Sequence, residues 1–98
     1  MNVKIQSVKF DADKKLIEFI EAKMDKLDRF VDRATSAEVI LKIDKDPEQG
    51  NKVATIKIEV PTETIIAEHQ SKSFEESVDG AIDAIKKQLE KHKDKFAK

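Results

Sequence analysis

A long C-terminal segment with a single apolar stripe constrains the fold of this chain more than any other feature. In residues 73–96 apolar side chains recur at helical spacing, at Val78, Ala81, Ile82, Ile85, Leu89 and Phe96. Ser73, followed three residues later by Glu76, is the capping-box pattern that begins a helix. The segment is therefore predicted to be one amphipathic helix, and another element must cover its apolar side.

A strand and a second helix are predicted upstream. Residues 2–10 are expected to form a strand, whose shifting alternation is compatible with a bulge. A helix should then begin at a cap supplied by Asp11 or Asp13 and continue to about Asp32. Its expected buried stripe consists of Leu16, Ile17, Ile20, Met24, Leu27 and Val31.

Three further strands are expected between the helices. Apolar and polar side chains alternate in residues 37–44 and again in residues 53–60. Residues 46–51 should form the turn between them, because Pro cannot continue a ladder and Gly and Asn tolerate positive φ. Residues 62–69 are predicted to form the last strand. Its register stays open at residues 65–67, where either the first isoleucine with the alanine or the second isoleucine could face inward.

The predicted order β-α-β-β-β-α indicates one α+β domain over residues 1–98. The three consecutive strands should form an antiparallel meander. Because each helix has one apolar stripe, the two helices should lie side by side on one face of a four-stranded sheet. The opposite face would then point to solvent. It would carry Glu38, Lys42, Thr55, Lys57 and Glu59.

Composition argues against several classes of function. The chain has no Cys, two His far apart in sequence, and two Gly, so it lacks a disulfide framework, a metal-binding motif and a phosphate-cradling loop. We therefore expect no enzyme activity, no cofactor, no metal and no small-molecule substrate. No apolar run approaches membrane-spanning length, so a cytoplasmic protein without membrane contact is expected.

Charge is distributed unevenly along the chain. The 19 Lys and Arg nearly balance the 20 Asp and Glu, for a net charge of −1, but residues 86–98 hold six lysines against two acids and carry +4. The rest of the chain therefore carries −5. Such asymmetry is expected when one surface meets phosphates. An ordinary solvated helix explains the same pattern, because acids near its start and bases near its end complement the macrodipole.

The lysines of the last helix fall on two sides of it when projected at about 100° per residue. Lys87, Lys91 and Lys95 form one stripe. Lys86 and Lys93 border the apolar face on the other side. Acids separate the two sets, at Asp83, Glu90 and Asp94.

The first helix has one basic and one acidic flank. The basic flank holds Lys15, Lys26, Arg29 and Arg33, and the acidic flank holds Glu21, Asp25, Asp28 and Asp32. Lys23 instead projects within the apolar arc, either as a lysine that snorkels along the neighbouring helix or as a functional residue. If the basic flank faces the last helix, the two helices form a positively charged groove suited to a phosphate backbone.

Three segments resemble a known family. V-D-G-A-I-D-A-I-K-K-Q-L-E-K-H-K-D-K, at residues 78–95, closely resembles the last helix of the ribosome hibernation-promoting and ribosome-associated inhibitor family, earlier described as modulators of an alternative sigma factor. A-K-M-D-K-L-D-R-F, at residues 22–30, resembles the family's first helix, and V-I-L-K-I-D-K, at residues 39–45, resembles its second strand. The resemblance covers nearly the whole chain and is most specific in the last helix.

The resemblance implies a fold like that of double-stranded-RNA-binding domains and a seat on the small ribosomal subunit, between its head and body. There the domain would occupy the mRNA channel and the tRNA sites and silence translation in starved or stationary cells. The implied partners are the small subunit and its rRNA, with a possible second factor for ribosome dimerisation. Carried over by position, the implied RNA-binding residues are Lys23, Lys26, Lys42, Lys87, Lys91, Lys93 and Lys95.

The chain departs from the family pattern just before the last helix. Family members typically show an acidic residue and then Met-Tyr, whereas this chain reads Lys72-Ser73-Phe74. Phe74 can keep the packing role of the ring but cannot make a contact through a hydroxyl. Because the chain ends at Lys98, without an acidic tail or an additional domain, it resembles the short form of the family. The alternative function is a protein-interaction module of the same fold, whose exposed sheet face recruits a protein partner.

Overall fold

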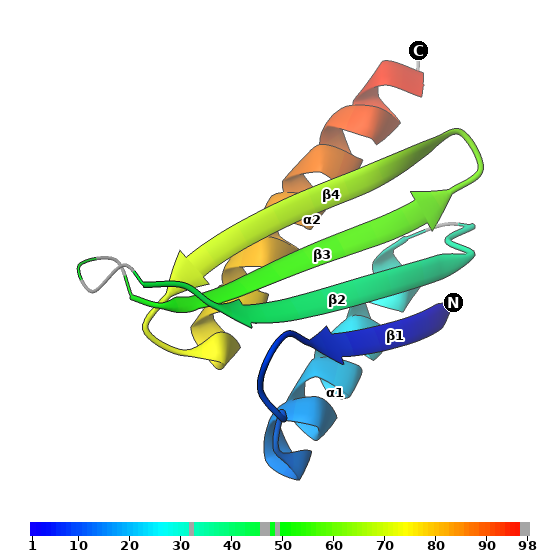
Figure 1. Cartoon of the computed structure of the whole chain (residues 1–98). Helices are drawn as coiled ribbons and strands as arrows, with labels where there is room; N and C mark the ends of the chain where they lie inside the picture. Colours follow the sequence, from blue (N-terminus) through cyan, green and yellow to red (C-terminus); the bar gives the residue numbers. More distant parts are fainter. Residues whose placement is uncertain (32, 46–47, 49, 97–98) are drawn as a thin grey trace.

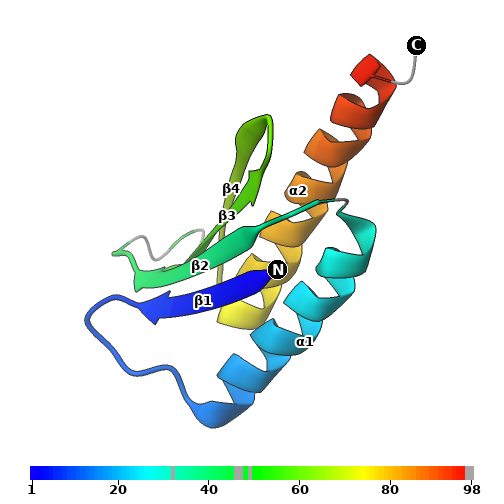
Figure 2. The same ribbon diagram turned by 90° about the vertical axis from the view of Figure 1, so that its right-hand side faces the viewer.

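Two helices cover one face of a four-stranded sheet in the computed structural model of the chain (Figures 1 and 2), which describes residues 1–31, 33–45, 48 and 50–96. The order β-α-β-β-β-α confirms the prediction. The elements are β1 (Asn2–Ser7), α1 (Lys14–Phe30), β2 (Ser36–Ile43), β3 (Lys52–Val60), β4 (Glu63–Ser71) and α2 (Phe74–Phe96).

The strands lie in their sequence order, β1-β2-β3-β4. β2, β3 and β4 form the expected antiparallel meander, whereas β1 pairs with β2 in parallel and is joined to it by the α1 crossover. The structure also settles the register of β4: Ile65 is 2% exposed and Ala67 is 7% exposed, whereas Ile66 is 52% exposed on the other face. The first isoleucine and the alanine are therefore the inward pair.

The apolar stripes of both helices meet the sheet as the sequence predicts. α2 packs on β3 and β4, and α1 packs beside α2 and against β1. The helices contribute the following buried residues: Leu16, Ile20, Met24 and Leu27 from α1, and Phe74, Val78, Ala81, Ile82, Ile85 and Leu89 from α2. Each large side chain removed from water stabilises the fold by about 1.5–3 kcal/mol. The side chain of Phe96, also assigned to the stripe, lies outside the described residues.

Both helices begin at side-chain caps. The backbone N–H of Leu16 donates to Asp13 Oδ1 at 2.8 Å, so Asp13, not Asp11, caps α1. The backbone N–H of Glu76 donates to Ser73 Oγ at 3.1 Å, which confirms Ser73 as the cap of α2. α1 ends at Phe30, because Val31 is already extended, with φ −96° and ψ 121°. The helix is therefore slightly shorter than predicted.

An aromatic stack closes the end of the molecule where α2 begins. The rings of Phe10 and Phe74 lie 5.0 Å apart with an interplanar angle of 9°, and Phe74 is 8% exposed. The ammonium group of Lys52 lies 5.7 Å from the centre of the Phe74 ring. Phe74 thus has the packing role that the family resemblance implied for its ring.

α2 approaches the edge strand β4 closely at two places. Gly80 faces the ring of His69, and a Cβ atom at Gly80 would stand 2.5 Å from the Cγ of that ring. About two turns further along α2, the side-chain amide of Gln88 donates to the backbone carbonyl of Ile66 at 2.9 Å. These contacts fix which side of α2 faces β4, and therefore which side remains for α1.

Candidate nucleic-acid interface

The two helices enclose a groove on the face away from the sheet. Its volume is about 400 Å³, and the buried side chains of Leu27 and Ile82 form its apolar floor. Three lysines and two aspartates line its sides, namely Lys23, Lys26, Asp79, Asp83 and Lys86. Of the predicted basic flank of α1, only Lys26 lines this groove, and Arg29 pairs with Asp25 on its own helix at 3.9 Å instead.

Lys23 bridges the two helices. Its Nζ lies 3.1 Å from Asp79 Oδ1, and it stands 5.4 Å from the centre of the Phe19 ring. The Lys23 side chain is 35% exposed and that of Asp79 is 50% exposed, so the pair sits at the mouth of the groove. The partial exposure and the ion pair fit a lysine that reaches from α1 towards the neighbouring helix, whereas a functional role for Lys23 stays a prediction.

The charge of the groove differs from the uniformly positive one expected. Asp79 and Asp83 come from the α2 side, one helical turn apart, so three positive charges are offset by two negative ones. The sequence projection placed Asp83 between the two sets of lysines, and it did not show that this acid faces α1. A groove of net charge +1 attracts phosphate far less strongly than one lined by lysines alone.

Lys86 is a groove residue that the predicted RNA-binding set omitted. Its Nζ lies 5.7 Å from the centre of the Phe30 ring on α1, so it reaches across the gap between the helices. The signal was present in the sequence. Asp79, Asp83 and Lys86 follow one another at spacings of four and three residues, which places them on one side of α2.

The other lysines of α2 form a second, separate surface. Lys87 and Lys91 are exposed but are not among the residues that line the groove. Lys91 follows Gln88 by three residues, so it lies on the β4 side of the helix. The last turns of α2 project beyond α1 (Figure 2). The side chains of Lys93 and Lys95 lie outside the described residues.

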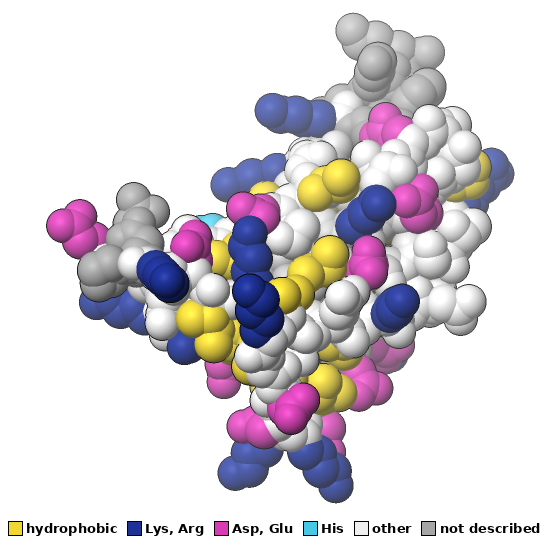
Figure 3. Space-filling view, in the orientation of Figure 1, with side chains coloured by type: hydrophobic (Ala, Val, Ile, Leu, Met, Phe, Trp, Pro, Cys, Tyr) yellow, Lys and Arg dark blue, Asp and Glu magenta, His cyan; other side chains and the backbone are white. Residues whose placement is uncertain are grey.

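Lys42 belongs to a third surface. It is exposed near the end of β2, and the alternation of that strand places it on the sheet face opposite the helices. Lysines and carboxylates are mixed on this face, with single hydrophobic side chains between them (Figure 3). The fold therefore divides Lys23, Lys26, Lys42, Lys87 and Lys91, the five predicted RNA-binding residues whose side chains are described, among the groove, the projecting end of α2 and the outer sheet face.

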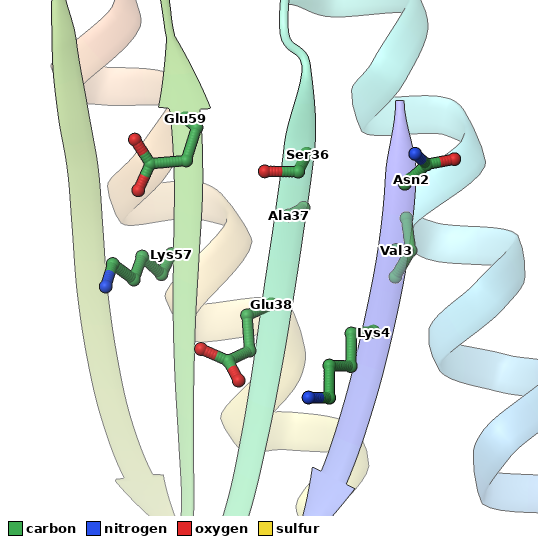
Figure 4. Close-up of a pocket in the computed structure, with 8 residues that line it drawn as sticks. All are labelled: Asn2, Val3, Lys4, Ser36, Ala37, Glu38, Lys57 and Glu59. Atoms are coloured by element: carbon green, nitrogen blue, oxygen red, sulfur yellow. The ribbon is translucent and has the colours of Figure 1, made fainter.

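A shallow hollow on the outer sheet face has the same alternation of sign. Its volume is about 300 Å³, and Figure 4 shows Lys4 on β1, Glu38 on β2, and Lys57 with Glu59 on β3. Cross-strand pairing places Lys4 beside Glu38 and Glu38 beside Lys57, so opposite charges are neighbours. These neighbouring opposite charges stabilise the solvent-exposed face of the sheet, and neither sign of charge dominates there.

The family is decided by the sequence match. Residues 3–97 match the profile of the family described as Sigma 54 modulation protein / S30EA ribosomal protein. The chain belongs to this family. Over 79 residues it is 33% identical to the ribosome hibernation promoting factor of Klebsiella oxytoca, an alignment that covers 81% of this chain and 79% of the relative. Over 96 residues it is 30% identical to the factor of the same name in Escherichia coli K12, with 98% of this chain and 97% of the relative covered.

A solved structure supports the fold of this family member. The structure of a ribosomal subunit interface protein from Coxiella burnetii superposes with a TM-score of 0.81, covering 95% of this chain and 98% of that one at 22% identity. At that identity the likeness concerns the fold alone.

In this family member the acids of α1 face away from the groove. Glu21, Asp25 and Asp28 line a cleft of about 540 Å³ between α1 and β1, where Asp28 pairs with the N-terminal ammonium group at 3.3 Å. α1 therefore separates a basic side from an acidic side. Within the described part of the chain, no helix is long and apolar enough to span a membrane, and no group of three or more His, Asp or Glu side chains could hold a metal ion.

Proposed function

We propose that this protein is a ribosome hibernation factor that binds the small ribosomal subunit through its rRNA. Family membership over residues 3–97 carries the proposal, together with relatives named ribosome hibernation promoting factor that align over nearly the full chain. In this proposal residues 1–98 act as one ribosome-binding domain, in the cytoplasm where ribosomes are found. No catalytic step is involved.

The lysines of both helices are the proposed rRNA contacts. Lys87 and Lys91 are exposed on the projecting end of α2, with Lys93 and Lys95 further along the same helix. Lys23 and Lys26 reach rRNA from the groove, and Lys42 contacts it from the edge of the outer sheet face. Ammonium groups on rigid elements suit an irregular phosphate backbone, because they supply charge without requiring a particular base sequence.

The proposed mechanism is occlusion. A folded domain held on the rRNA between the head and body of the small subunit would exclude mRNA and tRNA by volume, and translation would stop without any chemical change to the ribosome. The principal extents of the domain, 44 × 26 × 18 Å, exceed the width of an extended RNA strand in every direction. A second factor for ribosome dimerisation would be a partner in addition to the rRNA.

Charge reversal on α2 tests the proposed contact. Lys87→Glu with Lys91→Glu should reduce co-sedimentation with purified small subunits by at least about tenfold, because each lost phosphate contact removes favourable counterion release. The matched control is Lys14→Glu with Lys72→Glu, which changes net charge equally. Both control positions lie next to helix N-termini, where an acid is favourable, so the fold should be retained.

Two outcomes would contradict the proposal. Equal loss of binding in the control pair would mean that only net charge matters, and unchanged binding of the α2 variant would remove α2 from the interface. Association that survives ribonuclease digestion of the subunits would point to a protein partner instead. The occlusion mechanism itself requires that prebound mRNA and initiator tRNA lower the affinity for the subunit, and that the protein inhibit cell-free translation.

A further inference from the structure

The interhelical groove contains its own competitor for phosphate. Lys23 is the least exposed of the three lysines that line the groove, and its ammonium group is already paired with the Asp79 carboxylate at 3.1 Å. A phosphate that binds Lys23 must therefore displace this carboxylate or share the lysine with it. Within the described residues, Lys26 and Lys86 have no ion pair with a carboxylate in the groove.

The arrangement of the two helices allows a phosphate to replace the Asp79 carboxylate on Lys23. Asp79 belongs to α2 and Lys23 to α1, so the pair can open by side-chain rotation, without melting either helix. Both side chains are partly exposed, so water can solvate the released carboxylate, and such exposed pairs are weak. The Phe19 ring, 5.4 Å from the ammonium group, holds the lysine in place while its anion is exchanged.

We propose that Asp79 is an internal competitor that lowers the affinity of the groove for phosphates, so that Lys23 engages RNA only where phosphates are dense enough to displace the carboxylate. This proposal rests on the proposed function for the identity of the ligand. It makes Asp79 a specificity-determining residue, because an isolated phosphate competes poorly with a tethered carboxylate, whereas closely spaced phosphates also engage Lys26 and Lys86.

Substitution Asp79→Asn tests the proposal because it removes the charge and preserves the shape of the side chain. The affinity for small subunits at low salt should rise about two- to fivefold, the factor associated with an exposed ion pair. The matched control is Glu21→Gln, which changes net charge equally but lies in the cleft on the opposite side of α1. It should leave the affinity unchanged.

A second background separates competition from simple repulsion. In a Lys23→Met chain, which keeps the apolar stem, Asp79→Asn should lose most of its effect, because the lysine that the carboxylate occupied is gone. A gain of equal size in both backgrounds would overturn the proposal, since Asp79 would then act on the ligand directly. No gain in either background, in a protein that binds subunits, would overturn it as well.

A heparin column distinguishes failure of this inference from failure of the proposed function. Heparin is a densely charged polymer, so the groove should hold it whether or not the ribosome is the natural partner. Asp79→Asn should elute at higher salt than both the natural protein and Glu21→Gln. If that shift occurs while small subunits are not bound, the proposed function fails and the competitor role stands. If both variants elute together, the competitor role fails.

Discussion

Phe74 shows how a single residue fixes the start of a helix to the rest of the fold. Its ring stacks on Phe10, which belongs to the β1–α1 connection, and the ammonium group of Lys52 on β3 lies 5.7 Å from its centre. Three parts of the chain therefore meet at one aromatic side chain. The family resemblance implied that the Phe74 ring could keep a packing role, but its partners come from segments that only the folded chain brings together.

Truncation of this ring should destabilise the protein strongly. Phe74→Ala is expected to lower the free energy of unfolding by about 3 kcal/mol, because it leaves a cavity and removes the stack. Ile66→Ala, at a side chain that is 52% exposed, should cost less than about 1 kcal/mol. Urea denaturation followed by circular dichroism measures both. Equal losses in the two variants would show that the Phe10–Phe74 stack adds little to stability.

Lys23 illustrates what a sequence can and cannot reveal about one side chain. Its place inside an apolar arc already marks it as unusual, since a lysine there must either snorkel or find a partner. The partner, Asp79, lies in the other helix, and the choice among the acids of α2 depends on how the two helices are rotated against each other. That rotation is set by packing on the sheet, which no local pattern encodes.

At the scale of elements, helix limits and strand periods follow from local chemistry. The cap at Ser73, the alternation in β2 and β3, and the two apolar stripes could be predicted because each depends on residues close in sequence. The cap of α1 was narrowed to Asp11 or Asp13, and the structure decides for Asp13. The register of β4 was not readable, since adjacent isoleucines satisfy either period. Cross-strand packing decides it, by placing Ile65 beside Ile58 in the core.

The contact of α2 with β4 yields a substitution whose effect should change sign. Gly80→Ala gains helix propensity of about 1 kcal/mol, but the added methyl group overlaps the ring of His69 at its Cγ, which cannot move without a change of rotamer. We expect a net loss of about 1–2 kcal/mol in the free energy of unfolding. In a His69→Ala background the same substitution should stabilise the protein by about 1 kcal/mol. Thermal or urea unfolding of the unsubstituted protein, the two single variants and the double variant measures the coupling. Additive effects would contradict the close approach of Gly80 to the His69 ring.

At the scale of the whole molecule, the net charge of each surface depends on which segments the fold brings together, and not on the net charge of any one segment. The sequence predicted the lysines and their two sides of α2, but it did not predict that they divide among a mixed groove, a projecting helix end and the outer sheet face. Positions along a helix are fixed by local geometry, whereas convergence and cancellation of charge depend on tertiary packing. The fold was therefore more predictable than the site.

The projecting end of α2 should dominate the salt dependence of ribosome binding. Affinity for small subunits should fall as salt rises from about 50 to about 200 mM, because phosphate contacts release counterions. For Lys87→Glu with Lys91→Glu, the slope of log affinity against log salt should be shallower by about 1.5, since two contacts are lost. The Lys14→Glu, Lys72→Glu control should keep the original slope. Identical slopes in all three proteins would place the phosphate contacts elsewhere.

The hydrogen bond from the Gln88 side chain to the Ile66 carbonyl affects how the sheet edge can meet other chains. β4 is an outer strand, and outer strands invite other chains to continue the ladder, which is a route to aggregation. The Ile66 carbonyl already accepts a hydrogen bond from Gln88 of α2, so it is less available to an incoming strand. The side chain of the same residue is exposed, so the protected position coincides with an exposed isoleucine of the edge strand. The free edge of this sheet is thereby less able to pair with a second copy of the chain.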